Sequence, residues 1–338
     1  MSYGRFGTPK IYVDNLNWLL SLGKNDISNF SFTSSGSVAL ASGSSVPEMF
    51  DMKPSNLQTI SCNGASDDLF ISIDTGITSD DRVDNNFIAI LGHNLHQAGA
   101  SFRIQQSDSS NFVPNYNAES NTEIVNAVFS SPYFRPNKNG WSLATFADNT
   151  ASSANNRYWR INIIPSSSTY SSDIKIGAIL MGETISLPHS PDLEISKTFS
   201  YEGVTRQTST GGQTYANAQY LSGANWFLDP FNLSTDTSPN SLRKTGRQLI
   251  DMKFSYLTDT DVYPETLYSD IGIIGGNDFV TNMINKTHGG MFPFIFQYDN
   301  TLTDGQDSFL WCRLNNEPKF QQVAQRIWNT SIELIEEF

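Results

Sequence analysis

The sequence has few of the residues from which disulfide-stabilised folds and metal sites are built. Its 338 residues include two cysteines and four histidines, and only 16% of the residues are charged. A small secreted domain would use several cysteines in pairs, whereas Cys62 and Cys312 fall one in each predicted domain, so we expect two buried, reduced thiols. Nowhere are 18 consecutive residues apolar, so we expect no membrane insertion. The first ten residues lack the basic and apolar segments of a secretion signal.

Basic residues are scarce as well. The chain has 21 lysines and arginines against 34 acidic residues, which gives a net charge of −13 and a pI of about 4.6. Binding to nucleic-acid phosphates requires clustered Lys and Arg side chains, whereas these are scattered along the sequence. We therefore expect no specific nucleic acid among the partners.

The common catalytic motifs are missing too. There is no G-x-S-x-G or H-E-x-x-H sequence, and neither cysteine has a catalytic signature. His93 and His96 have no third ligand nearby at zinc spacing, and we interpret His93 as a turn residue that bonds backbone groups. The sequence thus predicts a protein that is not an enzyme and needs no cofactor. A polysaccharide hydrolase is a third hypothesis. It ranks last because hydrolysis needs a pair of carboxylates, and the sequence singles out no such pair among its acidic residues.

What the sequence does contain is apolar and alternating runs separated by polar turns, a pattern typical of all-β proteins. Residues 87–91 are continuously apolar, and after a polar turn residues 102–105 alternate between apolar and polar. Residues 157–183 repeat this arrangement, with an alternating strand, a polar turn and a second strand. We predict that these segments form the middle of a β-sandwich.

The rest of the chain divides at Pro188 and Pro191, which end one strand and stiffen the passage to the next module. We predict an N-terminal arm at 1–30, a sandwich at 31–187 and a mixed β module at 188–338. Further strands are predicted at 57–60, 69–73, 124–129, 193–201, 213–220, 247–257, 291–296, 309–314 and 327–334, with a helix at 278–286 and a helix N-cap at 258–261.

Short motifs connect this pattern to a known family. The order of an apolar strand, His-Asn-Leu at 93–95, the strand RYWRI at 157–161 and an I-G-x-I-x-x-G-E ending at 176–183 resembles discoidin-like (galactose-binding-like) jelly rolls. More narrowly, it resembles a tail-associated virion protein of tailed bacteriophages. The later order of hairpin, strand, helix, apolar strand at 293–296 and terminal strand is similar to modules of phage tail-tube and distal-tail proteins, although here the jelly roll comes first.

The resemblance implies a mainly β fold, with an N-terminal discoidin-like jelly-roll β-sandwich followed by a mixed β module with one or two short helices. It also implies a function as a structural component of a bacteriophage virion tail, assembled in the host bacterial cytoplasm. In that role the chain would form a ring with copies of itself and contact other tail proteins, and the arm at 1–30 would pack on its own second module or on a neighbour. The alternative is a carbohydrate-binding module that recognises a host surface glycan.

The long polar region 107–156 holds seven aromatic residues, too many for a disordered segment. We therefore expect ordered strands within it. Arg103, Tyr133 and Trp141 are our candidate carbohydrate-binding residues, because flat apolar rings suit the C–H faces of pyranose sugars. The structural alternative is that these aromatic side chains pack beneath the loop.

Three carboxylates, Asp80, Asp81 and Asp84, lie within five positions of the loop before residue 86. Calcium takes oxygen ligands from flexible loops, so these residues are candidate calcium ligands, and Asp81 is also a candidate contact for a sugar. An exposed acidic turn ahead of a buried strand is the structural alternative.

Overall fold

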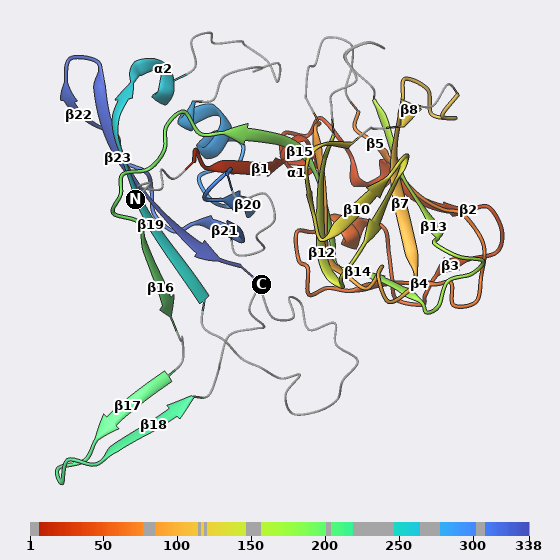
Figure 1. Ribbon diagram of the computed structural model, residues 1–338, viewed down its shortest axis with the longest axis horizontal. Helices are drawn as coiled ribbons and strands as arrows, with labels where there is room; N and C mark the ends of the chain where they lie inside the picture. Colours follow the sequence, from red (N-terminus) through yellow and green to blue (C-terminus); the bar gives the residue numbers. More distant parts are fainter. Residues whose placement is uncertain are drawn as a thin grey trace.

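The structure is a computed structural model that describes residues 7–76, 85–113, 116–117, 120–146, 157–200, 204–218, 247–263, 278–301 and 308–337. In these ranges the strands form two large sheets, one small three-stranded sheet and one separate hairpin, and their pairings are antiparallel (Figure 1). The predicted fold class, a mainly β chain with an N-terminal jelly-roll β-sandwich, is confirmed. None of the helices within the described ranges is both long and apolar enough to cross a membrane.

The seven-stranded sheet forms the outer layer of the sandwich. Its strand order is β10-β11-β7-β13-β5-β2, and β8 also pairs with β7. The strands are β2 (Phe30–Ser34), β5 (Leu69–Asp74), β7 (Ala100–Ser107), β8 (Tyr116–Asn117), β10 (Ala127–Ser130), β11 (Tyr133–Pro136) and β13 (Tyr158–Pro165).

The other large sheet has eleven described strands and runs through both parts of the molecule. Its order is β16-β19-β23-β21-β20-β1-β15-β6-β12-β9, and β22 pairs with β23. The strands are β1 (Lys10–Asp14), β6 (Phe87–His93), β9 (Ser120–Val125), β12 (Gly140–Phe146), β15 (Ala178–Ser186), β16 (Ser196–Ser200), β19 (Arg247–Thr258), β20 (Phe294–Gln297), β21 (Phe309–Leu314), β22 (Gln321–Ala324) and β23 (Ile327–Glu336).

Smaller elements complete the described chain. They are the sheet of β3 (Ala39–Leu40), β4 (Gln58–Ser61) and β14 (Ile174–Ile176), the hairpin of β17 (Val204–Thr208) and β18 (Thr214–Ala218), the helices α1 (Asn15–Ser21) and α2 (Asp259–Val262), and the short helical turns η1 (Ile27–Asn29), η2 (Pro47–Phe50) and η6 (Phe279–Asn285).

Strand β1 joins the two parts of the molecule. Ile11 pairs with Ile185 of β15 on one side and with Phe296 of β20 on the other. The sequence predicts an arm at 1–30 that packs on the second module or on a neighbour. Residues 10–14 of this segment pair with β20 of the second module, in line with that prediction, and they also pair with β15 of the sandwich, so the sheet continues past the predicted boundary at 187–188.

The two glycines of the I-G-x-I-x-x-G-E motif allow close backbone approaches around this joint. A Cβ atom at Gly182 would lie 2.0 Å from the carbonyl oxygen of Val13, and one at Gly177 would lie 2.0 Å from that of Pro54. Neither distance can accommodate a side chain, because the opposing atoms belong to the backbone. Close backbone packing therefore requires glycine at both of these positions of the motif.

Buried hydrophobic residues that the structure describes form three cores. The first lies between the two sheets of the sandwich and includes Ile90 of β6, and the second lies in the C-terminal part and includes Ile11 of β1. The third core covers the other face of the eleven-stranded sheet and combines Phe87 from the sandwich with Ile295 and Trp311 from the C-terminal part. Strand β6 is buried on both faces, and this explains its unbroken apolar run.

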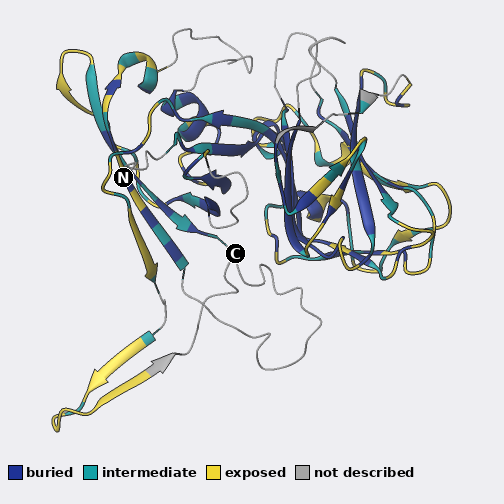
Figure 2. Ribbon diagram, viewed as in Figure 1, coloured by how far each residue is buried: buried dark blue, intermediate teal, exposed yellow. Residues whose placement is uncertain are grey.

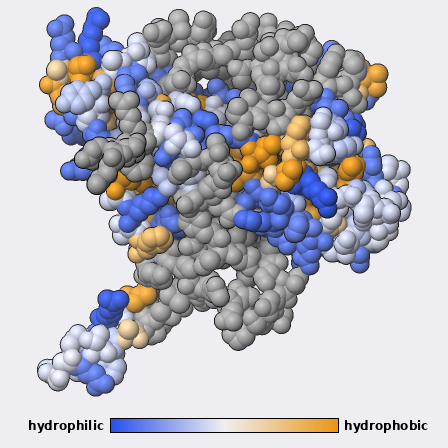
Figure 3. Space-filling view, viewed as in Figure 1, coloured by the Kyte–Doolittle hydropathy of each residue, from blue (hydrophilic) through white to orange (hydrophobic). Residues whose placement is uncertain are grey.

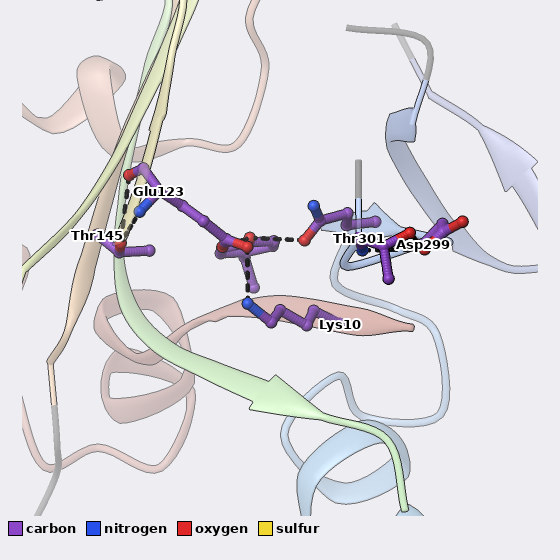
Figure 4. A network of polar contacts seen from close by, with 7 residues as sticks. Lys10, Glu123, Thr145, Asp299 and Thr301 are labelled. Carbon is purple, nitrogen blue, oxygen red and sulfur yellow. Dashed lines mark hydrogen bonds and ion pairs between the residues drawn. The ribbon is translucent and has the colours of Figure 1, made fainter. Parts of the chain in front are cut away.

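A buried polar network lies beside the third core (Figure 4). Glu123 of β9 receives a bond from Lys10 Nζ at 2.7 Å and a second from the Tyr12 hydroxyl, which also lies 3.1 Å from Gln297 Oε1. Thr145 Oγ1 accepts from the Glu123 backbone N–H at 3.0 Å. Burial, followed by the charge of Glu123, raises the pKa of Tyr12 well above its ordinary value. The network links β9, β1 and β20, which are distant in sequence.

Most local predictions are confirmed, with one correction. The predicted strand at 124–129 is two strands in different sheets, because Asn126 adopts a left-handed conformation with φ of 58° and turns the chain from β9 into β10. The predicted helix at 278–286 is η6, capped by Asp278, whose Oδ1 accepts from Thr281 N at 2.6 Å. The N-cap at 258–261 forms a capping box at the start of α2.

The hairpin of β17 and β18 projects away from the two packed parts (Figure 1). Apart from its half-buried first residue, Val204, β17 is exposed, and Tyr215 of β18 is 58% exposed (Figure 2). The visible face of its tip is largely hydrophilic, with hydrophobic residues near its base (Figure 3). A two-stranded hairpin is only marginally stable in water by itself, and none of the cores that the structure describes includes a residue of β17 or β18.

Candidate functional site

The outward face of the seven-stranded sheet carries a row of polar and aromatic side chains. Along β13, Trp159, Ile161 and Ile163 point into the sandwich core, so Arg160 and Asn162 point outward. Directly opposed residues of neighbouring strands share a face. The register therefore places Gln105 of β7 beside Arg160, and places Arg103 of β7 and Phe70 of β5 on either side of Asn162.

Arg160 is the best-fixed residue of this face. Its guanidinium carbon lies 4.6 Å from the ring centroid of Phe70 and 4.2 Å from that of Phe112, so two aromatic rings pack against it. Its Nε and Nη2 groups both donate to Gln105 Oε1, at 3.0 Å and 2.7 Å. Phe112 reaches this position through a turn in which its own φ is 55° and its N–H donates to Ser109 O.

The Phe70–Arg160–Phe112 arrangement, here called the arginine stack, is partly withdrawn from water. Burial lowers the pKa of Arg160 below the ordinary arginine value, and the neighbouring charge of Arg103 lowers it further. The guanidinium remains charged at neutral pH because arginine starts from such a high value. The arginine stack is thus a pre-positioned cation that two aromatic rings pack against.

Arg103 and Tyr133 form a second pair beside the arginine stack. Phe134 of β11 pairs with Phe102 of β7 in the core, which turns the adjacent Tyr133 and Arg103 outward together. The guanidinium carbon of Arg103 lies 5.1 Å from the centre of the Tyr133 ring. Both side chains are half-buried, and Arg103 Nε is buried without a hydrogen-bond partner among the described residues.

Asn162 lies under these larger side chains. It is fully buried, and neither its side-chain nitrogen nor its side-chain oxygen has a hydrogen-bond partner within the described part of the chain. Leaving a buried amide unsatisfied costs about 1–3 kcal/mol. The face therefore holds unused hydrogen-bonding capacity directly beside two guanidinium groups.

The edge of the face is closed by a neutralised arginine. Arg157 donates from Nε to Asp74 Oδ1 at 2.6 Å and from Nη2 to Asp74 Oδ2 at 2.8 Å. Its hydrogen bond to Asp74 raises the pKa of Arg157, and its guanidinium carbon also lies 5.3 Å from the centre of the Tyr158 ring. This two-pronged pairing assigns Arg157 a structural role, in contrast to Arg103 and Arg160.

The structure brings together two of the three predicted carbohydrate-binding residues. Arg103 and Tyr133 are neighbours, but Trp141 lies on β12 in the other large sheet, where it is 2% exposed and packs 5.7 Å from Phe309. An indole buried on both faces cannot stack on a sugar, and the prediction for Trp141 is corrected to the structural alternative. The predicted calcium ligands Asp80, Asp81 and Asp84 lie outside the described residues.

Sequence reasoning did not single out Phe70, Phe112 or Arg160 as site residues. The alternation of RYWRI already predicts that Arg160 points away from the core, on the other face of the strand from Trp159. This alternation could have identified Arg160 as a candidate site residue. The two rings could not be found in the same way, because Phe70 meets Arg160 through the pairing of β5 with β13, and Phe112 meets it through a turn that follows β7.

His93 and His96 bond in different directions. His93 is buried, its Nδ1 accepts from Leu95 N, and its Nε2 lies 2.9 Å from Ser142 Oγ. The predicted bond to a backbone group is confirmed, but His93 is the last residue of β6 and not part of the turn that follows. His96 Nδ1 lies 3.1 Å from the carbonyl oxygen of Pro136. Over the described ranges, no group of three or more His, Cys, Asp or Glu side chains could hold a metal ion.

The two cysteines are free and lie in separate cores. Burial raises the pKa of the Cys62 thiol to about 11 and raises that of Cys312 well above its ordinary value. Neither thiol is therefore activated as a nucleophile.

Several solved structures of carbohydrate-binding modules are similar to this chain. Chitosan-binding module 1 of a chitosanase/glucanase from Paenibacillus sp. IK-5 shares 14% identity over 47% of this chain and 99% of its own, with a TM-score of 0.31. Module 2 of that enzyme, solved with chitotriose, shares 12% over 47% and 100%, with a TM-score of 0.30. CBM32-1 from a family 31 glycoside hydrolase of Clostridium perfringens shares 12% over 45% and 94%, also at 0.30. No family model and no curated protein matches the sequence.

Proposed function

We propose that the protein binds carbohydrate on the outward face of its seven-stranded sheet and does not act as an enzyme on it. The observation that carries this proposal is the pairing of fixed guanidinium groups with aromatic rings, in the arginine stack and at Arg103–Tyr133. Sugars offer hydroxyl groups to planar hydrogen-bond donors and C–H faces to aromatic rings. This face presents both kinds of contact on rigid strands.

Replacing Tyr133 by alanine is expected to weaken binding to a polysaccharide at least about tenfold, which corresponds to ~1.4 kcal/mol. The ring is half-buried and its loss leaves the core residue Phe134 in place, so the fold should remain. The binding partner is first identified on a glycan array, and its affinity is then measured by affinity electrophoresis.

Tyr215→Ala is the matched control, since this exposed tyrosine lies on the projecting hairpin. Equal losses in the Tyr133 and Tyr215 variants would place the binding site elsewhere. A chain that retains no glycan on a broad array would overturn the proposed function altogether.

The projecting hairpin favours a second candidate function, that of a structural subunit in an assembly. Its strands lack a core of their own within the described chain, and the neighbouring edge strand β16 exposes Phe199 at 54%. Exposed strand edges and hairpins readily pair with other chains. In this candidate the chain forms a homo-oligomeric ring in a bacteriophage virion tail, with other tail proteins as further partners and the hairpin as a contact between subunits.

The mass of the protein in solution tests this second candidate. We expect light scattering to give a discrete oligomer for the full chain and a monomer for a variant in which a short Gly-Ser link replaces residues 205–217. Tyr256→Ser, at an exposed residue of β19, is the control and should keep the oligomer. A monomer at all concentrations for the unmodified chain would count against self-assembly.

A further inference from the structure

Within the part of the chain that the structure describes, Arg103 and Arg160 have no acidic partner. Neither has a carboxylate within ion-pair distance among the described residues, whereas Arg157, Arg313 and Arg326 each do. The chain has 34 acidic and 21 basic residues, so it contains more carboxylates than are needed to pair with every basic side chain. Their absence from this part of the structure leaves a local positive site on a chain of net charge −13.

The register places the two guanidinium groups within reach of one small anion. Arg103 opposes Asn162, and Arg160 lies two residues from Asn162 on the same strand. Such diagonal neighbours are about 7–8 Å apart between backbones, a separation that long side chains can bridge. That the charge of Arg103 lowers the pKa of Arg160 supports their closeness.

Both arginines are held in place before any ligand binds. Gln105 and two rings fix Arg160, and the Tyr133 ring packs against Arg103. Planar guanidinium groups match the oxygens of carboxylates and sulfates with paired, charge-assisted hydrogen bonds. Fixing them in advance reduces the entropy lost on binding.

Asn162 provides an independent sign of a ligand. Its amide is fully buried between Arg103 and Phe70, with both polar atoms unpartnered in the described structure. A further oxygen inserted between the two arginines would give this amide a partner. No apolar ligand would do so.

We infer that this face recognises an anionic sugar, with its carboxylate or sulfate group between Arg103 and Arg160 and its ring against Tyr133. The inference rests on the proposed carbohydrate binding and adds the charge class of the glycan. Because the protein has a negative net charge, it repels an acidic polymer overall. Such a polymer would therefore bind through this local site and not through general electrostatic attraction.

Binding to four soluble polymers distinguishes recognition of the charged groups from recognition of the sugar backbone. Polygalacturonate and fully methyl-esterified pectin share a backbone and differ in charged carboxylates, and dextran sulfate and dextran differ in sulfates. We expect one acidic member to bind at least tenfold more tightly than its neutral counterpart, as measured by affinity electrophoresis and calorimetry with the full chain. The pair that shows this difference identifies the anionic group.

Arg103→Gln should reduce that preference at least tenfold, while Arg206→Gln, the same charge change on the exposed hairpin, should leave it unchanged. Arg103→Lys keeps the charge but not the planar pair of donors, and is expected to lose about as much as the glutamine variant. Thermal unfolding of each variant verifies that the fold is kept.

Equal binding to the acidic and neutral members, with loss in Tyr133→Ala, would overturn the anionic inference and leave carbohydrate binding standing. Equal losses in the Arg103 and Arg206 variants would also overturn it, because binding would then follow overall charge. Failure to bind any of the four polymers together with an empty glycan array would overturn the proposed function itself.

Discussion

Replacing Trp311 by alanine should lower the free energy of unfolding by about 3–5 kcal/mol. Trp311 is fully buried in the third core, which it shares with Phe87 of the sandwich and Tyr12 of β1. Removing the indole leaves a cavity between two parts of the chain that are far apart in sequence. Because one continuous sheet and one core connect them, we expect a single unfolding transition, shifted as a whole.

Trp311→Phe should lose less, about 1–2 kcal/mol, because it keeps an aromatic ring and removes a buried donor. The indole N–H has no hydrogen-bond acceptor within the described part of the chain. Phe199→Ala, at an exposed position, is the control and should change stability by less than about 0.5 kcal/mol. Urea unfolding followed by both fluorescence and circular dichroism measures all three variants. Two separate transitions, only one of them shifted, would contradict the shared core.

The second large effect is a loss of stability in acid that originates at His93. Burial, with a smaller contribution from the charge of His96, lowers the pKa of His93 from 6.5 to about 3. Its Nδ1 already accepts from Leu95 N, so the proton of the neutral ring resides on Nε2, which donates to Ser142 Oγ. A second proton would have to displace the Leu95 bond in a fully buried site.

The direction of this effect follows from proton uptake. Between pH 6.5 and about 3 the unfolded chain binds a proton at His93 that the folded chain does not, so stability falls as the pH decreases through this window. Between pH 7.5 and 5 we expect a loss of about 2 kcal/mol from this group alone.

His93→Gln isolates this contribution, because glutamine can donate to Ser142 but does not titrate. Its stability should change less between pH 7.5 and 5 than that of the unmodified chain, as measured by urea unfolding at each pH. The control is His96→Gln, at an exposed residue of the turn that follows β6. If the His93 variant shows the full acid dependence, the loss arises from other groups.

Much of the fold could be read from the sequence because its signals are local. The alternation in β13, the capping residues at Thr258 and Asp278, and the strand pattern of β23 each depend on residues within a few positions. The continuous apolar run of β6 also indicated a buried strand. The sequence did not indicate which residues pack against the face of β6 that lies in the third core, because these residues come from β1, β20 and β21, which are distant in the chain.

The candidate site was only half predictable for the same reason. Arg103 and Tyr133 were chosen for their chemistry, and the pairing of β7 with β11 makes them neighbours. Trp141 has equally suitable chemistry, but it lies on a strand that is buried on both faces, and the sequence of such a strand does not reveal an inward or outward side.

The sequence by itself determined the mainly β class, the positions of most strands and the shortage of catalytic groups. Tertiary structure decided that β1 is an internal strand joining both parts, that Phe70 and Phe112 pack against Arg160, and that Trp141 belongs to the core. The physical reason is that periodicity specifies which side chains share a face of one strand. Which strands then lie side by side depends on the pairing and burial of segments distant in the chain.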